Sequence, residues 1–565
     1  MGSGDRVTGG ALLARARAAA ERRGVEEVAF ELAFALERGC GVLGLPPGRL
    51  GPEEAGRLYE QLLATCSASR KALGAFYTPQ PVARAIARRL LADVDAGGPV
   101  PRIIDPACGT GAFLLAAARA LRRRGVSPRA IGCALWGIDR DAGALALCRA
   151  ALRAEGIAVP RDHLLQQDAL LAPWPRAHFD RILGNPPFVN IVRLPAPQRQ
   201  ALKARYRSFR NKCDLYGLFV EAGIDHLALG GRLSFILSDS FLGTDSFAPL
   251  RRLLFASEAR RVRRIDRLAG ATFGAKVRAV VLEVEARPPD AAVPVALGRI
   301  DAAGRVEAGH ALPHAIFRRR AARSAALPED ARQLAWAEAL EAEARPLSDF
   351  LELSLGVKTG DDGRFVSPRR RGRSARRCVR GRDVGPFSIT DRCYIDYRPE
   401  RLRAVHGARP RRPESFLRPM KLLLRETSGA RLIAAVDTEA RIPLDTLHAL
   451  YPRAEGPNGR SLHGWCALLN SAPLCRWYAL HHPGPHVKAG EVRRLPVPPP
   501  RPEPLSARLN ALPALAAYLA GAPWHRDIEA APEAVLDCLG RWMSGHRDPR
   551  GQAAIDRLCA KLYGV

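Results

Sequence analysis

The sequence predicts an α/β fold in which a parallel sheet occupies the N-terminal half and a smaller α+β domain follows it. Between about residues 71 and 290, short apolar runs alternate with helical stretches rich in alanine and leucine. This alternation is typical of the strands and crossover helices of a parallel sheet. From about residue 346 the pattern changes to short strands, arginine clusters and prolines. The two halves of the chain are therefore expected to differ in fold class.

The length of 565 residues predicts two or three domains, each able to bury a core. Residues 1–70 have apolar positions spaced by three and four, which predicts a helical N-terminal segment. The sheet domain is expected over residues 71–290, followed by a connector over 291–345. A mixed domain is expected over 346–500, where a proline-rich stretch precedes a helical tail over 501–565.

The composition is strongly basic, with 87 Lys and Arg against 57 Asp and Glu and a formal net charge of +30. Such a charge favours a polyanionic partner, nucleic acid first, although a general drift of the composition toward arginine is an alternative explanation. The sequence has neither an apolar run of transmembrane length nor a signal pattern, so we expect no membrane association and a cytoplasmic location. The 12 cysteines lack C-x-x-C spacing, so neither a disulfide framework nor a metal site is predicted.

A glycine turn joins the first predicted strand, Ile103–Asp105, to the helix that follows it. Gly109 and Gly111 allow the backbone to approach a ligand closely, and the N-terminus of the next helix favours anionic groups. Many nucleotide-binding proteins share such a turn, so it is weak evidence by itself. The chain has no G-K-[ST] phosphate loop, which argues against a nucleotide triphosphate as the ligand.

Acidic residues end three successive predicted strands, namely Asp105, Asp139 and Asp168. Asp139 is suited to accept hydrogen bonds from both hydroxyls of a ribose, and Asp168 from the amino group of an adenine. Each acid alone is explained equally well as a turn residue or helix cap. Three such strand ends in order are harder to explain as caps. They predict a site for an adenosine that carries a charged tail.

The tetrapeptide Asn185-Pro186-Pro187-Phe188 ends the fourth apolar run, which predicts a short buried strand followed by a sharp turn. Two consecutive prolines prevent the strand from continuing, so the Asn185 side chain and the Pro186 carbonyl are expected to face outward. Their oxygens suit an exocyclic amino group, and Phe188 offers a flat face on which a ring can stack. A plain proline turn after a strand is the alternative interpretation.

In this order the motifs resemble those of the S-adenosylmethionine-dependent DNA methyltransferases that modify amino groups, specifically the gamma-class, TaqI-like N6-adenine enzymes. The resemblance extends from about Leu58 to the C-terminus. It implies a Rossmann-like class I methyltransferase sheet and a C-terminal α+β target-recognition domain. It also implies S-adenosyl-L-methionine as the cofactor and double-stranded DNA as the partner.

The resemblance assigns cofactor binding to four motifs. Residues 74–79 are similar to the N-terminal cofactor motif, whose threonine region meets the methionine part of the cofactor. The implied cofactor-binding residues are Tyr77, Thr78, Asp105, Ala107, Gly109, Gly111, Asp139 and Asp168. Asn185, Pro186, Pro187 and Phe188 are the implied catalytic residues, with phenylalanine where many relatives have tyrosine.

Two further segments resemble parts of the family that hold the target base. Phe273, within residues 272–277, resembles an aromatic residue that helps to hold a flipped base, so Phe188 and Phe273 are the implied stacking residues. A core position is the alternative for Phe273. Asp214 and Tyr216 resemble a segment near the target-base pocket, and a helix cap explains them equally well.

The C-terminal half contains segments that resemble the opening of the target-recognition domain, at residues 355–360 and 379–384. An arginine cluster lies at and before the second segment. Its members are expected to contact phosphates and, in part, guanine edges. The DNA-contacting residues that we infer are Arg369, Arg370, Arg371 and Arg380, and a solvated basic loop is the alternative.

The function implied is site-specific methyl transfer to N6 of an adenine flipped out of duplex DNA. A restriction-modification or phage-defence role is expected, without a nuclease on this chain, and with a separate endonuclease or defence proteins as partners. The expected form is a monomer on DNA, associated with the nucleoid in a bacterial cytosol. The alternatives are amino-group methylation of RNA or of a protein glutamine, and a DNA-binding module that has lost activity. The long basic C-terminal half and the intact motifs favour the DNA enzyme.

Overall fold

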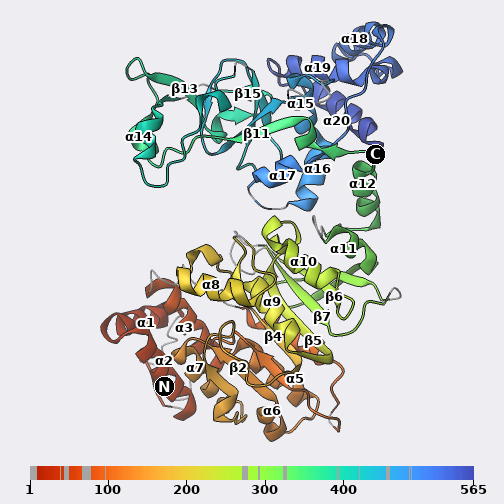
Figure 1. Cartoon of the computed structure of the whole chain (residues 1–565). Coiled ribbons are helices and arrows are strands. Elements are labelled where there is room, and N and C mark those ends of the chain that lie inside the picture. The colour runs from red at the N-terminus through yellow and green to blue at the C-terminus, as the bar shows by residue number, and fades with distance from the viewer. Residues whose placement is uncertain are drawn as a thin grey trace, which may run out of the picture. The chain divides into compact units, whose positions relative to one another are not determined.

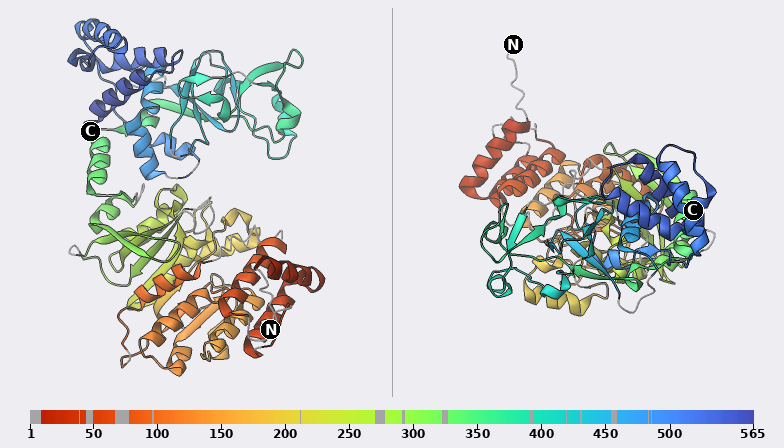
Figure 2. Two further views of the ribbon diagram at one scale, coloured as in Figure 1. Left: turned by 180° about the vertical axis from the view of Figure 1, so that it is seen from behind. Right: turned by 90° about the horizontal axis from the view of Figure 1, so that it is seen from above.

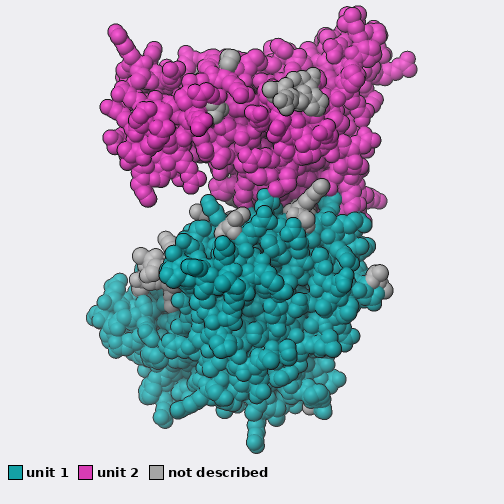
Figure 3. Space-filling model, viewed as in Figure 1, with its two compact units in different colours: residues 1–325 teal, residues 326–565 magenta. Residues whose placement is uncertain are grey.

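The computed structural model describes the chain except for residues 1–8, 39, 44–49, 67–77, 96, 211, 270–277, 291–292, 322–326, 391–392, 419, 430, 454–458, 483 and 485. The chain divides into two compact units, Met1–Ala325 and Ala326–Val565 (Figure 3). Each unit has hydrophobic clusters of its own, as expected of separate domains. In the described part of the chain, no helix is long and apolar enough to cross a membrane.

Unit 1 begins with three helices, α1 (Gly9–Arg23), α2 (Val25–Arg38) and α3 (Pro52–Cys66). Their apolar faces share a core with one face of α7 (Ala142–Ala154), so they gather beside that helix (Figures 1 and 2). Gly143 on α7 permits the close approach, because a Cβ there would lie 2.8 Å from Tyr59 Oη. The N-terminal helices are thus packed against the sheet domain.

Nine strands in the described part of unit 1 form one sheet, in the order β3-β2-β1-β4-β5-β7-β6-β8-β9. Strands β1 to β5 are parallel, and β7 lies antiparallel between β5 and β6. This arrangement confirms the α/β sheet expected from the sequence. The strands are β1 (Ile103–Asp105), β2 (Leu135–Asp139), β3 (Leu164–Gln166), β4 (Phe179–Gly184), β5 (Leu227–Ser238), β6 (Arg261–Leu268), β7 (Ala279–Glu285), β8 (Val295–Ile300) and β9 (Val306–Leu312).

The sheet continues into the stretch expected to be a connector. Strand β8 pairs in parallel with β6, and β9 pairs antiparallel with β8. The prolines at 288 and 289 therefore lie in a loop between two strands of one sheet. Proline is common in such turns, because its fixed φ angle suits them. The boundary between the two units falls at residue 325.

Helices connect the strands of the parallel half and bury apolar faces on the sheet. Helix α5 starts at the glycine turn after β1, and α7 starts directly after β2. The other helices of unit 1, some of them outside the parallel half, are α4 (Gln80–Leu90), α5 (Ala112–Arg123), α6 (Pro128–Ala134), α8 (Ala196–Arg205), α9 (Leu215–Asp225), α10 (Ala248–Phe255) and α11 (His314–Arg320). Because β1 and β4 are neighbours where the strand order reverses, the loops after their carboxyl ends diverge there and leave room for a ligand.

Unit 2 combines small sheets with helices. Two four-stranded sheets have the orders β11-β20-β17-β18 and β12-β16-β13-β19. Their strands are β11 (Leu351–Leu355), β12 (Val366–Ser367), β13 (Ala375–Val379), β16 (Cys393–Asp396), β17 (Lys421–Arg425), β18 (Ala434–Asp437), β19 (Ile442–Pro443) and β20 (Leu447–Pro452). The pairs β10 (Arg345–Pro346) with β21 (Pro496–Val497) and β14 (Val384–Gly385) with β15 (Ser388–Ile389) complete the strands.

Most helices of unit 2 contribute to one large core that includes the helical tail, whereas Phe365 and Leu402 belong to a second cluster. Gly540 on the tail lies so close to α15 (Leu462–Leu469) that a Cβ there would be 2.1 Å from the His463 carbonyl oxygen. Arg460 and Glu533 also form a buried ion pair at 2.7 Å between the mixed region and the tail. The helices are α12 (Ala331–Ala342), α13 (Asp362–Phe365), α14 (Pro399–Arg403), α15 (Leu462–Leu469), α16 (Ala472–His481), α17 (Ala489–Arg493), α18 (Leu505–Leu519), α19 (Pro532–Met543) and α20 (Pro549–Tyr563).

Candidate cofactor and catalytic site

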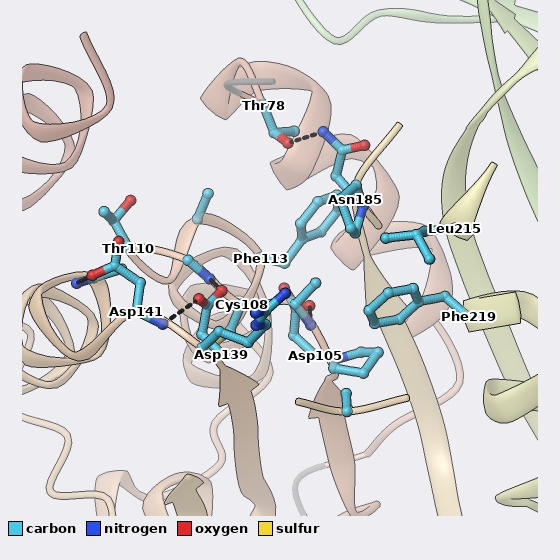
Figure 4. A pocket seen from close by; sticks show the side chains of 18 of the residues that line it. Thr78, Asp105, Cys108, Thr110, Phe113, Asp139, Asp141, Asn185, Leu215 and Phe219 are labelled. Atoms are coloured by element: carbon cyan, nitrogen blue, oxygen red, sulfur yellow. Dashed lines mark hydrogen bonds between the residues drawn. The ribbon is translucent and has the colours of Figure 1, made fainter. Parts of the chain in front are cut away.

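A pocket of about 400 Å³ lies in unit 1 at the carboxyl ends of β1 to β4. The loops after these strands form most of its lining, and α3 contributes one wall. Figure 4 shows the acids Asp105 and Asp139 on one side, with Asn185 above Leu215 and Phe219 on the other. The pocket thus brings together acids that the sequence placed on separate strands and the asparagine of the tetrapeptide.

The glycine loop after β1 is held between two of the acids. The backbone N–H of Ala107 donates to Asp105 Oδ1 at 3.0 Å, and that of Gly109 donates to Asp139 Oδ2 at 2.8 Å. Gly109 and Gly111 have φ angles of 52° and 90°, which other residues adopt rarely. A Cβ at Gly111 would lie 2.6 Å from Cys148 Sγ, whereas one at Gly109 would meet nothing within 4 Å. Gly109 therefore presents bare backbone to the pocket.

Asp139 lies at the end of β2 with both carboxylate oxygens engaged by backbone. Oδ1 accepts from the N–H of Asp141 at 2.9 Å, and Oδ2 accepts from Gly109. Each carboxylate oxygen has a second lone pair, so Asp139 keeps the capacity to accept from ribose hydroxyls. Burial raises the pKa of its carboxyl group above the usual range, partly offset by these backbone bonds.

Asp105 is almost fully buried at the end of β1. Burial raises the pKa of its carboxyl group to about 8, and the nearby charge of Asp139 acts in the same direction. Gly184 at the end of β4 makes the close packing possible, because a Cβ there would lie 2.5 Å from Asp105 Oδ1. Asp105 is therefore largely protonated at neutral pH until a cation approaches.

Asp168 follows β3 and serves partly as a turn residue, which is one of its two predicted roles. Its Oδ1 accepts from the N–H of Leu170 at 3.0 Å, and its Oδ2 accepts from Gln198 Nε2 at 3.3 Å. Arg140 Nε lies 3.9 Å from Oδ2. Asp168 lines the pocket nevertheless, so contact with an adenine remains open to it.

The side chain of Asn185 is oriented by a residue from a distant motif. Asn185 Nδ2 donates a hydrogen bond to Thr78 Oγ1 at 3.0 Å, across 107 positions of sequence. Thr78 is buried just before α4, so the packing around it restricts the position of its hydroxyl. With Nδ2 directed at Thr78, Oδ1 is turned away from it (Figure 4). Asn185 and Pro187 line the pocket, and Pro186 is buried between them.

Phe188 is braced by aromatic residues. Its ring meets that of Tyr216 edge to face at 5.5 Å, and Tyr216 stacks on Phe247 at 5.0 Å. Tyr216 Oη and Ser240 Oγ share a hydrogen bond of 2.8 Å, which satisfies the hydroxyl of a fully buried tyrosine. The interpretation of Tyr216 as a residue of the base pocket was left open by the sequence. Phe247 and Ser240 were not predicted, because no local pattern links them to the tetrapeptide.

Helix α3 contributes pocket residues that the sequence did not reveal, among them Tyr59 and Glu60. Thr110 Oγ1 donates to Glu60 Oε1 at 3.1 Å, and Tyr59 Oη donates to Asp141 Oδ1 at 2.9 Å. Gly56 allows α3 to lie on the glycine loop, because a Cβ there would be 2.9 Å from Thr110 Oγ1. The amphipathic pattern of α3 predicts only that one face is buried. No sequence motif near Tyr59 or Glu60 indicates that they line a pocket.

Among the other predicted site residues that the structure describes, Gly111, Pro186, Phe188 and the four arginines do not line this pocket. Tyr77 and Phe273 lie outside the described residues. Arg369, Arg370 and Arg371 are exposed in the turn between β12 and β13 in unit 2. Arg380 follows β13, and its guanidinium donates to Asp362 Oδ2 at 3.3 Å. The groups of His, Cys, Asp and Glu that a metal ion needs do not occur among the described residues.

The charges of the pocket fit a cationic ligand. Its acidic and basic lining residues are Glu60, Asp105, Asp139, Asp141, Asp168 and Arg140, so carboxylates outnumber the one guanidinium even with Asp105 protonated. Such a lining attracts a sulfonium or ammonium group and repels a triphosphate. Together with the bare backbone at Gly109, it fits S-adenosyl-L-methionine, whose adenosine would lie toward Asp139 and Asp168.

Comparison with known proteins relates this site to a family. The profile described as N-6 DNA Methylase matches residues 52–255. The chain is 32% identical over 170 residues to the Type II methyltransferase M.PaeR7I of Pseudomonas aeruginosa, which covers 27% of this chain and 29% of the relative. It is 34% identical over 225 residues to the Type II methyltransferase M.TthHB8I of Thermus thermophilus, which covers 38% of this chain and 46% of the relative. The chain thus spans less than half the length of either relative.

Among solved structures, the Type IIL restriction-modification enzyme MmeI in complex with DNA is similar over 98% of this chain and 92% of that chain. The TM-score is 0.57 at 16% identity, so this likeness shows a shared fold. With the strand order and the loop after β1, it confirms the predicted class I methyltransferase sheet followed by a further domain. Residues 52–255 therefore match the N-6 DNA methylase family, in agreement with the resemblance to the gamma class.

Proposed function

We propose that this protein is a site-specific adenine DNA methyltransferase, which transfers a methyl group from S-adenosyl-L-methionine to N6 of an adenine extruded from duplex DNA. The observation that carries the proposal is the Asn185 amide, oriented by Thr78 at the rim of an acidic pocket. An amide oxygen held beside a backbone carbonyl is an acceptor pair for an exocyclic amino group. The match of residues 52–255 to the N-6 DNA methylase family supports the same chemistry.

Asn185 and Pro186 are the proposed activators of the target nitrogen. The lone pair of adenine N6 is delocalised into the ring, which makes the amine a poor nucleophile. Accepting its hydrogens through Asn185 Oδ1 and the Pro186 carbonyl favours a tetrahedral nitrogen with a localised lone pair. S-adenosyl-L-methionine supplies an electrophilic methyl group on a sulfonium. Rate enhancement then comes from positioning and electrostatic complementarity to the transition state.

Phe188 is the proposed stacking surface for the extruded base. Removing a base from the duplex costs a few kcal/mol, which stacking offsets in part. The contact with Tyr216, itself stacked on Phe247, limits the orientations of the Phe188 ring. Phe273 is the second proposed stacking residue, on the basis of the motif around it. In the cofactor site we assign Tyr77, Thr78 and Ala107 to the methionine part, Asp139 to the ribose and Asp168 to the adenine.

Unit 2 is the proposed target-recognition domain. The net charge of +30 and the exposed arginines at 369–371 support a polyanionic substrate. Curated relatives are named Type II methyltransferases, which supports a restriction-modification or phage-defence role with separate endonuclease or defence proteins as partners. We propose that the protein acts as a monomer on DNA at the nucleoid. Methylation of RNA or of a protein glutamine is the less favoured alternative, because the matching family profile is described as N-6 DNA Methylase.

The test is methylation of defined substrates by the purified chain. Duplex DNA incubated with labelled cofactor is digested to nucleosides, and N6-methyladenine is the expected product. Sequencing of the modified DNA then identifies the target motif. The Asn185→Ala variant is expected to lose methyl transfer while cofactor binding, measured by calorimetry, is retained. Label on RNA or protein in place of DNA, or turnover of Asn185→Ala near that of the unaltered protein, would contradict the proposal.

A further inference from the structure

Unit 2 contains a hollow of about 450 Å³ whose lining is rich in arginine. Residues from the loop after β13 and from the end of β17 converge on it. We call it the arginine hollow, and it is lined by Asp362, Arg380, Gly381, Arg382, Arg425, Thr427 and Thr446. The lining residues include three arginines and one aspartate, so their net formal charge is positive.

The loop that supplies Arg380 and Arg382 is held by specific hydrogen bonds. The N–H of Gly381 donates to Thr446 Oγ1 at 2.8 Å, and the N–H of Arg380 donates to Asp383 Oδ2 at 3.1 Å. A Cβ at Gly381 would lie 2.8 Å from the Thr446 carbonyl oxygen, so glycine permits this approach. The two arginines therefore belong to a loop whose backbone is fixed against Thr446, the residue before β20.

Arg380 and Asp362 form one side of the hollow. The guanidinium of Arg380 donates to Asp362 Oδ2 at 3.3 Å, and Thr359 Oγ1 donates to Asp362 Oδ1 at 2.6 Å. The carboxylate of Asp362 is thus directed at partners within the protein. It neutralises Arg380 in part and leaves the charges of Arg382 and Arg425 to the hollow.

Of the three arginines that line the hollow, Arg425 is the one on a strand. As the last residue of β17 it pairs with Leu447 of β20, and its N–H donates to the Ile433 carbonyl at 3.0 Å. Its Nε is buried and finds no acceptor among the described residues. The Arg425 guanidinium thus keeps hydrogen-bonding capacity that the described residues do not use. Arg382, in contrast, is exposed at the rim.

We propose that the arginine hollow binds a phosphodiester of the DNA backbone, with Arg425 and Arg382 as its two principal donors. This inference rests on the proposed function, because it takes duplex DNA as the partner. Guanidinium forks match phosphate oxygens in charge and geometry, and the hydroxyls of Thr427 and Thr446 add uncharged donors. The hollow is concave, as a site for a phosphate that protrudes from a duplex must be.

The proposal differs from the expectation based on sequence, in which the cluster at 369–371 dominates DNA contact. Those arginines occupy an exposed turn, where each loses much side-chain freedom on binding. Arg382 and Arg425 are separated by 43 positions (425 − 382), yet they line one hollow from fixed backbone. Groups held in place in advance lose less entropy on binding than groups on a free turn.

The experiment measures DNA affinity of the full chain as a function of salt. The variants Arg425→Gln and Arg382→Gln each remove one positive charge from the hollow. Arg547→Gln is the matched control, because it removes the same charge from an exposed loop between α19 and α20. Two duplexes are compared, one with the methylated motif found by sequencing and one with that motif scrambled. Thermal melting establishes that each variant is folded, and the exposed Arg382 provides a test if Arg425→Gln fails to fold.

If the two arginines contact a phosphate, each variant should lose the same DNA affinity on both duplexes. Each hollow variant is expected to lower affinity about tenfold on either sequence, as for a lost charge-assisted hydrogen bond. The slope of log K against log salt is expected to fall by about one. The control is expected to change neither quantity. Arg425→Lys is expected to recover the salt slope, because a lysine still neutralises one phosphate.

Three outcomes overturn the inference. Unchanged affinity in both hollow variants removes the arginine hollow from the DNA interface. A loss confined to the duplex with the motif assigns the arginines to base reading. A thermal shift with inorganic phosphate that Arg425→Gln abolishes, with DNA affinity intact, assigns the hollow to a free phosphate. If the unaltered protein neither binds nor methylates either duplex, the proposed function itself fails, and that result is distinct from these three.

Discussion

Thr78 and Asn185, 107 positions apart, are joined by a hydrogen bond of 3.0 Å from Asn185 Nδ2 to Thr78 Oγ1. The bond connects the segment before α4 with the loop after β4. An unrestrained asparagine amide rotates about its last torsion, so its oxygen and nitrogen exchange places. The hydrogen bond with Thr78 Oγ1 restrains that rotation, and with Nδ2 as its donor it leaves Oδ1 for a substrate.

Replacing Thr78 by valine, which has the same shape but lacks the hydroxyl, is expected to lower kcat about tenfold to a hundredfold. The physical reason is that small misplacements of a positioning group reduce catalysis on this scale. Steady-state kinetics on the methylated motif measures the effect. Thr78→Ser restores the hydroxyl and is expected to restore most of kcat. Near-normal kcat in the valine variant, or a loss in the serine variant as large as that in the valine variant, would contradict this role of the hydroxyl.

Glu60→Gln is expected to weaken binding of S-adenosyl-L-methionine about tenfold, in line with the loss of one charge-assisted interaction. Glutamine keeps an oxygen that accepts from Thr110, so the glycine loop retains its contact with α3. Only the negative charge toward the cationic ligand is removed. Calorimetric titration measures the affinity. Glu54→Gln, on the same helix but outside the pocket lining, is the control and is expected to bind normally.

Asp105 is expected to make the stability of the cofactor-free protein depend on pH. Its folded-state pKa of about 8 lies above the ordinary value, so its contribution is fully present only below about pH 4. That contribution is lost progressively as the pH rises toward about 8. Asp105→Asn stays neutral, so its Tm relative to the unaltered protein is expected to increase between pH 5 and pH 8. A difference in Tm that is constant over this range would contradict the raised pKa.

Binding of the cationic cofactor is expected to ionise Asp105 and release a proton. Affinity therefore rises with pH over the range from 6 to 8, by up to about tenfold per pH unit. Calorimetry in buffers with different ionisation enthalpies counts the protons released. The Asp105→Asn variant is the control, and its affinity is expected to vary much less with pH.

Asp437→Ala is expected to destabilise unit 2 by about 3–5 kcal/mol, because it removes one partner of a buried ion cluster. The side chains of Lys421 and Asp437 are fully buried, and Arg441 donates to Asp437 Oδ1 at 2.7 Å. Burial already lowers the pKa of Lys421, so the ammonium depends on this carboxylate. Urea unfolding measures the loss. The double variant Lys421→Met/Asp437→Ala is expected to recover part of it, and no recovery would assign the loss to Arg441.

Local sequence patterns predicted the parts of the site that lie on single strands and turns. The runs before Asp105, Asp139 and Asn185 are short and apolar, and each ends in glycine, acid or proline residues that terminate a strand. Strand ends in a parallel sheet lie on one edge, so the order of these motifs was sufficient to predict one shared site. The domain end expected at residue 290 does not coincide with the division after Ala325. Pro288 and Pro289 lie in a loop between two strands of the same sheet.

By itself, the sequence determined the α/β class, the strand-end acids and the identity of the Asn-Pro-Pro-Phe turn, because these depend on periodicity and turn chemistry within a few residues. Only the tertiary structure decided which distant groups meet: Thr78 with Asn185, Glu60 with Thr110, and Arg382 with Arg425. Each meeting depends on how whole elements pack, including glycines such as Gly56 that admit a close approach. Packing is a property of surfaces many residues apart, and no local pattern in one sequence encodes it.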